Sequence, residues 1–232
     1  MKIAGIQELT LIDYPKKLAC TLFIYGCNFR CGFCHNPELV IKPLEKEFSE
    51  EEIMIFLEKR KQYLDGVCIT GGEPLISLEE DFLKRIKDLG YSIKIDTNGS
   101  FPEKLKMLIE KKMVDFISMD IKSDKESYNE ISKTNVDIKK IEESIKIISN
   151  SGLEYEFRTT VVPGYHNKEK MIKLAKWIKD IAGRPKKYVI QNFVARNTLV
   201  DEKFSRINGF KEEELEEMKN AVEDYFEEVK IR

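Results

Sequence analysis

Three cysteines near the start of the chain are spaced as ligands of one metal centre. Cys27, Cys31 and Cys34 form the pattern C-x3-C-x2-C within the stretch CNFRCGFCHNP, and the whole chain contains five cysteines. A loop of this length can place three thiolates around one face of a cubic iron-sulfur cluster, which normally takes four. Three protein ligands would leave one iron open to an external ligand, so the pattern favours metal or redox chemistry.

A structural zinc site, with His35 as its fourth ligand, is the main alternative to the cluster. Cys34 and His35 are adjacent, which is sterically awkward for two ligands of one tetrahedral ion, and no second CxxC pair occurs in the chain. A disulfide framework does not suit an odd number of clustered cysteines, and a purely structural cysteine cluster remains open. Cys20 and Cys68 lie within apolar segments and are expected to be small core residues.

A second group of chemically useful residues reads GGEP at positions 71–74. Gly71 and Gly72 would let a ligand approach the backbone closely, and Glu73 offers a carboxylate to an ammonium group. The alternative interpretation is a plain turn with a rigid exit at Pro74.

Two aspartates and two basic residues follow at the ends of later apolar segments. Asp96 and Asp120 would repel each other on neighbouring strands unless a cation or a ligand donor lies between them, although either could instead cap a helix or form an Asx turn. Lys122 and Arg158 add positive charge that could hold a carboxylate. A surface salt bridge is the alternative role for Arg158.

These residues need a scaffold that brings them together, and alternating strands and helices provide one. Strands are predicted at 18–25, 66–70, 91–95, 114–121, 155–162 and 187–194. Helices are predicted at 53–64 behind a Ser49 and Glu52 capping box, and at 102–111, 138–151, 168–182 and 212–228. Alternation implies parallel strands joined by right-handed crossovers, in either an open doubly wound sheet or a barrel.

About six βα units are two short of a complete eight-unit barrel, so the expected fold class is α/β, an open partial (β/α)6 TIM-like barrel. The carboxyl ends of its strands would share one rim. The cysteine loop would follow the first predicted strand and residues 195–197 the sixth, with residues 122–135 as the longest polar interruption.

Length and charge narrow the class of protein further. The 232 residues suffice for one domain spanning residues 1–232. The 39 basic and 41 acidic side chains give a formal net charge of -2, so neither nucleic acid nor a membrane surface is expected as a partner. No window approaches the roughly 18 apolar residues of a membrane span, and a cytoplasmic protein is expected.

Together, CNFRCGFC and GGEP resemble the radical S-adenosylmethionine superfamily, whose core fold is a partial (β/α)6 barrel. Five further stretches resemble activating enzymes of glycyl radical enzymes, and most of all those that serve anaerobic ribonucleoside-triphosphate reductase. These stretches are IDYP (12–15), CHNPEL (34–39), DTNG (96–99), MDIK (119–122) and RTTVVPG (158–164).

The resemblance implies a role for each candidate residue. The three cysteines of the loop would hold a 4Fe-4S cluster, and Phe33 would lie near the adenine of S-adenosylmethionine unless it only packs in the core. Gly72 and Glu73 of GGEP would receive the methionine ammonium and Lys122 its carboxylate. Asp96, Thr97 and Asp120 would bind a monovalent cation, and Arg158 would line the cavity. His35 and His166 are expected to be structural.

The implied reaction is reductive cleavage of S-adenosylmethionine to a 5'-deoxyadenosyl radical, which takes a hydrogen from a glycine of a large partner enzyme. A flavodoxin or ferredoxin would supply the electron. One cluster is expected, because no insert with extra CxxC pairs follows residues 34–39. The alternatives are activation of pyruvate formate-lyase or another glycyl radical enzyme, and a small-molecule radical enzyme such as 7-carboxy-7-deazaguanine synthase. A zinc-binding module without catalysis is the last alternative.

Overall fold

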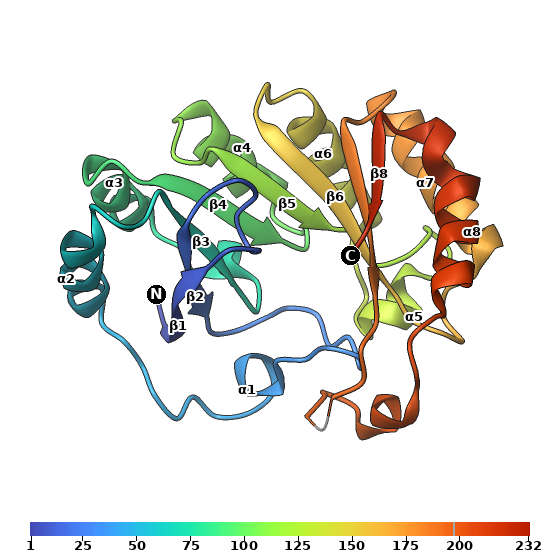
Figure 1. Cartoon of the computed structure of the whole chain (residues 1–232), viewed down its shortest axis with the longest axis horizontal. Helices are drawn as coiled ribbons and strands as arrows, with labels where there is room; N and C mark the ends of the chain where they lie inside the picture. Colours follow the sequence, from blue (N-terminus) through green and yellow to red (C-terminus); the bar gives the residue numbers. More distant parts are fainter. Residues whose placement is uncertain (197) are drawn as a thin grey trace.

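The computed structural model describes residues 1–196 and 198–232 and contains one curved, eight-stranded sheet in the order β1 to β8 (Figure 1). β1 runs antiparallel to β2, and every later pair is parallel. Within the described residues β1 and β8 are the two edges, so the sheet is an open partial barrel, as predicted. The strands are β1 (Ile3–Thr10), β2 (Ala19–Ile24), β3 (Gly66–Gly71), β4 (Ser92–Thr97), β5 (Phe116–Asp120), β6 (Glu154–Val161), β7 (Lys187–Asn192) and β8 (Glu228–Ile231).

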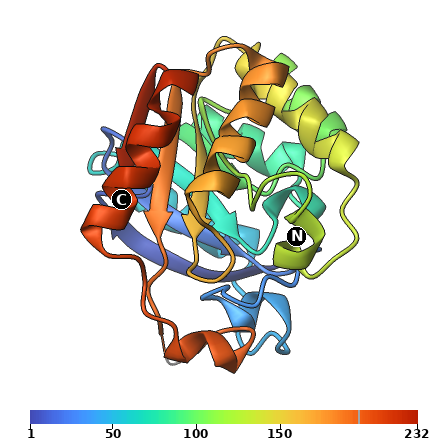
Figure 2. The same cartoon turned by 90° about the vertical axis from the view of Figure 1, so that its right-hand side faces the viewer.

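Helices cover the outer face of the sheet, while the short helices α1 and α5 lie at the end where the parallel strands finish (Figures 1 and 2). The helices are α1 (Pro37–Val40), α2 (Glu50–Arg60), α3 (Glu80–Asp88), α4 (Pro102–Glu110), α5 (Tyr128–Ser132), α6 (Ile138–Ser149), α7 (Lys168–Ala182) and α8 (Glu212–Val222). Three 3-10 turns complete the list: η1 (Pro74–Ile76), η2 (Glu202–Arg206) and η3 (Glu223–Tyr225). None of the helices in the described part of the chain is long and apolar enough to cross a membrane.

All six predicted strands are confirmed, because each apolar segment is buried between the helices and the interior of the barrel. In β3, for example, Val67, Cys68 and Ile69 are fully buried. Parallel strands covered on both faces have this nearly continuous apolar pattern. Cys20 and Cys68 are fully buried in β2 and β3, as expected for core residues.

The predicted capping box at the start of α2 is confirmed. The backbone N–H of Glu52 donates to Ser49 Oγ at 3.2 Å, and the backbone N–H of Ser49 donates to Glu52 Oε2 at 2.7 Å. Asn167 likewise accepts from the backbone N–H of Lys170 at the start of α7, and Gly183, with φ +74°, directly follows the last residue of this helix. Local side-chain chemistry therefore sets these helix ends.

Several elements differ from the prediction. α2 ends at Arg60 rather than at residue 64, and α3, which buries Phe82, Leu83 and Ile86, had no predicted counterpart. α8 ends at Val222 rather than at residue 228, because the chain turns and adds β8 to the edge of β7. Glutamates favour a helix locally, but pairing with the open edge of β7 decides the structure there. α5 lies within the polar interruption at 122–135.

Candidate active site

A cavity at the carboxyl ends of the strands brings together most of the predicted site residues. It is lined by the three loop cysteines and Phe33, by both glycines of GGEP, and by residues that follow β4 and β5. Among the described residues, its lining consists of Cys27, Phe29, Cys31, Phe33, Cys34, His35, Asn36, Val40, Thr70, Gly71, Gly72, Asp96, Thr97, Asn98, Asp120, Lys122 and Thr160. Neither Glu73 nor Arg158 belongs to this set. Asn197, within the predicted polar segment 195–197, lies outside the described residues.

GGEP supports the start of the cysteine loop through its backbone. The N–H of Gly72 donates to Ile24 O at 2.9 Å, and the N–H of Glu73 donates to Gly26 O at 2.8 Å. A Cβ atom at Gly72 would collide with the backbone of Gly26, and Gly71 has φ +122° with no room for a side chain beside Ile24. The chain's own backbone therefore lies so close to Gly71 and Gly72 that no side chain fits at either position. A bound ligand is not needed to explain these glycines.

The cysteine loop is also tied to the segment after β4. Asn28 Nδ2 donates to Ser100 Oγ at 2.9 Å, and Asn98 Nδ2 donates to Asn28 Oδ1 at 2.9 Å. The backbone N–H of Arg30 donates to Ser132 O, at the end of α5, at 2.8 Å. Sequence reasoning did not identify Asn28, Asn98 or Ser100, since amides after a strand usually indicate only a turn.

A segment near η2 lies against the other half of the loop, and Figure 2 shows it beside α1 at one end of the molecule. The backbone N–H of Asp201 donates to Gly32 O at 2.9 Å, and that of Val200 donates to Cys34 O at 3.2 Å. Phe33 is 8% exposed, and its ring lies 6.2 Å from that of Phe204 in an edge-on contact. Phe33 thus both lines the cavity and packs in the core.

The three loop thiols are free and largely buried, and burial raises the pKa of each. The pKa rises to about 12 for Cys27 and to about 11 for Cys31, with Lys122 acting in the opposite direction. Bound metal cations would favour the thiolates that burial disfavours. Within the described residues, no three His, Cys, Asp or Glu side chains meet closely enough to hold a single metal ion. Mononuclear zinc stays an alternative, and the thiolates of a cluster would bind separate irons.

Glu73 is fully buried and its carboxylate already accepts three hydrogen bonds. Thr97 Oγ1 donates to Oε1 at 2.8 Å, and the backbone N–H groups of Leu75 and Asn98 donate at 3.1 and 2.6 Å. Burial raises the pKa of Glu73 to about 7, although these bonds act against the rise. The observed contacts join the end of β3 to the end of β4. Contact between Glu73 and an ammonium group stays a prediction.

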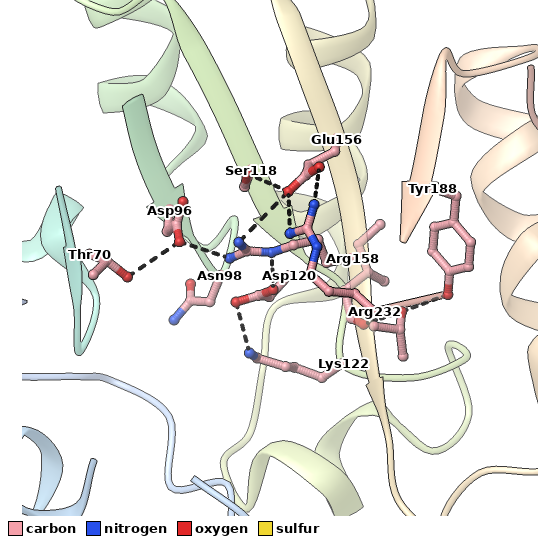
Figure 3. Close-up of polar contacts among 12 residues, drawn as sticks. Thr70, Asp96, Asn98, Ser118, Asp120, Lys122, Glu156, Arg158, Tyr188 and Arg232 are labelled. Atoms are coloured by element: carbon pink, nitrogen blue, oxygen red, sulfur yellow. Dashed lines mark hydrogen bonds and ion pairs between the residues drawn. The ribbon is translucent and has the colours of Figure 1, made fainter. Parts of the chain in front are cut away.

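Arg158 joins the two predicted aspartates (Figure 3). Its Nε donates to Asp120 Oδ1 at 2.9 Å, and Nη2 donates to Asp96 Oδ2 at 3.1 Å. Arg158 is only 8% exposed, so its interpretation as a surface salt bridge is wrong. Burial alone would raise the pKa of Asp120, but the charges of Arg158 and Lys122 outweigh it and lower the pKa to about 2. The guanidinium relieves the repulsion that motivated the predicted monovalent cation.

Lys122 lines the cavity, and its ammonium lies 3.5 Å from Asp120 Oδ2. Burial alone would lower the pKa of Lys122, but Asp120 outweighs this effect and raises it. The Lys122 carbonyl interacts with Nε2 of His166 at 2.9 Å, while His166 Nδ1 accepts from the backbone N–H of Val162 at 3.1 Å. Since Nδ1 accepts, Nε2 carries the proton and donates to Lys122. These contacts support the structural role expected for His166.

His35 also has a structural environment, although it lines the cavity. Its ring stacks on Phe193 with centroids 5.7 Å apart, and Nε2 lies 2.7 Å from the Val194 carbonyl oxygen. Burial lowers the pKa of His35.

Charged residues inside the barrel support the site from below, and the sequence did not reveal them. Lys94 is 1% exposed and pairs with Asp96, and the fully buried Glu156 lies 2.9 Å from Lys187 Nζ and 3.4 Å from Arg232 Nη1. Figure 3 shows Glu156 and Arg232 beside Arg158. Lys94 and Glu156 are charged residues within apolar segments. A charge in such a segment is the feature of the sequence that could have indicated a buried ion pair.

Comparison with known proteins agrees with this geometry. The sequence model described as "Radical SAM superfamily" matches residues 21–178, more than half of the chain, so the chain belongs to the radical SAM superfamily. A radical SAM methyltransferase from Sphaerobacter thermophilus has a TM-score of 0.73 at 12% identity, covering 97% of this chain and 68% of its own. A domain of a pyruvate-formate lyase-activating enzyme from Bacteroides vulgatus has a TM-score of 0.57 at 18% identity, covering 72% and 98%.

Two full-length relatives narrow the family. A candidate glycyl-radical enzyme activating enzyme of Methanocaldococcus jannaschii is 34% identical, covering 99% of this chain and 95% of its own length. The pyruvate formate-lyase-activating enzyme of Clostridium pasteurianum is 30% identical, covering 98% of both chains. The chain belongs to the radical SAM family of glycyl radical enzyme activating enzymes. Membership implies a 4Fe-4S cluster and S-adenosylmethionine, and a cavity lined by three thiols and by Lys122 fits both groups.

Proposed function

We propose that this protein generates a glycyl radical on anaerobic ribonucleoside-triphosphate reductase. The observation that carries the proposal is the meeting, in one cavity, of three loop thiols, the Lys122 ammonium and the backbone of Gly71 and Gly72. This arrangement offers soft ligands to a cluster and a cation to the carboxylate of a bound amino acid. The resemblance of the motifs along the chain supports the choice of this reductase.

When bound, the cluster would supply one electron for cleavage of S-adenosylmethionine to the radical that acts on the partner's glycine. Cys27, Cys31 and Cys34 would hold the cluster, and Lys122 would pair with the methionine carboxylate. Gly72 and Glu73 would receive the methionine ammonium, and Phe33 would border the adenine. The chain's contribution is to position these groups and to exclude water from a buried loop.

A monovalent cation beside Asp96, Thr97 and Asp120 is a further part of the proposal. Arg158 contacts both carboxylates, at 3.1 and 2.9 Å, so cation binding requires the guanidinium to release at least one of them. Added potassium should then protect the loaded protein against unfolding more than added tetramethylammonium at the same ionic strength.

The second candidate target is pyruvate formate-lyase, because a relative named for its activation aligns over nearly the full length of this chain. A small-molecule radical enzyme such as 7-carboxy-7-deazaguanine synthase would instead need polar groups that hold a pterin-like ring. Consumption of a small substrate without a partner protein would favour that alternative.

Anaerobic reconstitution with iron and sulfide tests the function. About four irons per chain are expected, with reductive cleavage of S-adenosylmethionine, and both should be lost in Cys31→Ala. Cys20→Ala is the matched control, since Cys20 is equally buried but lies in β2 away from the cavity lining. The loaded protein is then mixed with each candidate target, and a glycyl EPR doublet is recorded. Cleavage retained in Cys31→Ala contradicts the site, and a doublet on pyruvate formate-lyase alone contradicts the first target.

Three broader expectations accompany the proposal. The continuous eight-stranded sheet supports treating residues 1–232 as one domain. Thiols that must stay reduced for cluster assembly favour the cytoplasm. A flavodoxin or ferredoxin is the proposed electron donor, and reduction of the loaded cluster by each purified donor tests this choice.

A further inference from the structure

Tyr128, the first residue of α5, has a buried hydroxyl group without a hydrogen-bond partner among the described residues. Its side chain is fully buried. The hydroxyls of Ser77 and Ser149 share this property, and the ring of Tyr128 contacts Phe29 of the cavity lining. An orphaned buried hydroxyl is destabilising unless an acceptor is present in the working state of the protein.

The ring of Tyr128 is fixed against the cysteine loop. Phe29, which lines the cavity two residues before Cys31, contacts the ring edge-on with centroids 6.4 Å apart. Trp177 contacts the ring in the same manner at 6.1 Å. The last residue of α5, Ser132, accepts at 2.8 Å from the backbone N–H of Arg30, the residue just before Cys31. The helix that carries Tyr128 is thus bonded to the loop that carries Cys31.

The charges around the hydroxyl belong to the site. Burial raises the pKa of Tyr128; the charge and backbone N–H of Lys122 act against this rise, and Cys31 and Asp120 add to it. A backbone N–H can only donate, so even a contact with Lys122 leaves the phenol proton without an acceptor. Asp120 pairs with Lys122 and accepts from Arg158, but in the structure it makes no hydrogen bond with the phenol, whereas the thiolate of Cys31 would be a new acceptor when the cluster is bound.

We propose that Tyr128 is a positioning residue whose hydroxyl donates a hydrogen bond to the Cys31 thiolate when the cluster is bound. This inference rests on the proposed cluster site. A hydrogen bond to a ligand sulfur stabilises the more negative, reduced cluster and therefore makes reduction easier. Tyr128 would then help the cluster to accept the electron on which the reaction depends.

Tyr128→Phe removes the hydroxyl and keeps the ring. Tyr188→Phe is the matched control, because Tyr188 is also fully buried but donates to Thr159 Oγ1 at 2.7 Å, outside the cavity lining. In metal-free protein, Tyr128→Phe should leave the Tm unchanged or higher, since the lost hydroxyl had no acceptor. Tyr188→Phe should lower the Tm, since it removes a satisfied hydrogen bond.

Iron and sulfide contents are measured first, so that only fully loaded samples are compared. The cluster is then titrated with a reductant at defined potentials. The EPR signal of the reduced cluster gives the ratio of reduced to oxidised cluster at each potential. At a fixed potential this ratio should fall about three- to tenfold in Tyr128→Phe. It should match the wild type in Tyr188→Phe.

An unchanged ratio in fully loaded Tyr128→Phe overturns the inference and leaves the proposed function intact. Weaker binding of S-adenosylmethionine without a change in the ratio also overturns it, because the acceptor would then be the cosubstrate carboxylate. Wild-type protein that takes up no cluster overturns both this inference and the proposed function.

Discussion

Arg158 and Asp120 face each other on directly paired positions of β6 and β5, and Nε of the arginine lies 2.9 Å from Oδ1 of the aspartate. The same guanidinium reaches Asp96 on β4. One buried cation therefore sets the positions of two carboxylates at the rim of the sheet. Lys122 follows Asp120 by two residues and forms an ion pair with it, so the position of Asp120 also holds Lys122 at the cavity.

Arg158→Gln should destabilise the protein by about 3–5 kcal/mol at neutral pH, because it removes a buried cation shared by two partly buried carboxylates and by the buried Glu156. Burial acts the other way, but the charges of Arg158 and Lys122 lower the pKa of Asp120 to about 2 in the wild type. The loss should therefore shrink as the pH falls from about 4 to about 2, where the wild-type carboxylate also takes up its proton. Urea unfolding at about pH 7 and about pH 3 measures both effects.

The control for this variant is Arg60→Gln. Arg60 pairs with Glu8 at 2.9 Å on the surface, where the two side chains are 46% and 62% exposed, so a loss below about 1 kcal/mol is expected. Equal losses in the two variants would show that the Arg158 network does not differ from a surface ion pair.

His166→Phe should cost about 2–4 kcal/mol at pH 7.5, because the Val162 N–H and the Lys122 carbonyl both lose their partner. Burial lowers the pKa of His166 to about 4, so the folded protein holds this ring neutral. In the unfolded chain the ring takes up a proton below about pH 6.5, so the stability due to His166 declines as the pH falls from about 6.5 to about 4. Denaturant unfolding at pH 7.5 and pH 5 should show a smaller difference between wild type and variant at the lower pH.

Gly72→Ala should destabilise the fold by about 1–3 kcal/mol and lower the iron content after reconstitution, because the new methyl group displaces Gly26 at the start of the cysteine loop. Gly5→Ala is the control, since its Cβ would meet only Phe23 at an ordinary 3.6 Å. Thermal unfolding and iron analysis of both variants check the prediction. Full iron loading of Gly72→Ala would contradict the role assigned to this backbone contact.

The predictable parts of this protein are those with local signals. Apolar segments indicated the six central strands, and the capping box of Ser49 and Glu52 fixed the start of α2. The spacing of the cysteines identified the loop. In contrast, β8 forms because it pairs with the open edge of β7. The residues before it are rich in glutamate and resemble the end of a helix.

The polar interior of the barrel was also beyond sequence reasoning. Lys94 and Glu156 lie in strands, and Asp96 and Arg158 follow them by two residues on the same face of the same strand. Arg158 meets Asp96 and Asp120, and Arg232 meets Glu156, only across the sheet. The sequence identified GGEP as important. The need for glycine at position 72 became clear only from the structure, where the backbone of Gly26 lies against it. Pairing across the sheet decides the contact of Arg158 with Asp120.

The hydrogen bonds of the cysteine loop have a consequence for how the protein acquires its metal. The loop at residues 27–34 is bonded to Asn98, to Ser132, and to the backbone of Val200 and Asp201. During synthesis these partners leave the ribosome long after the cysteines do. The loop can make all of these hydrogen bonds only after residue 201 has emerged, so the site described above is complete only late in synthesis.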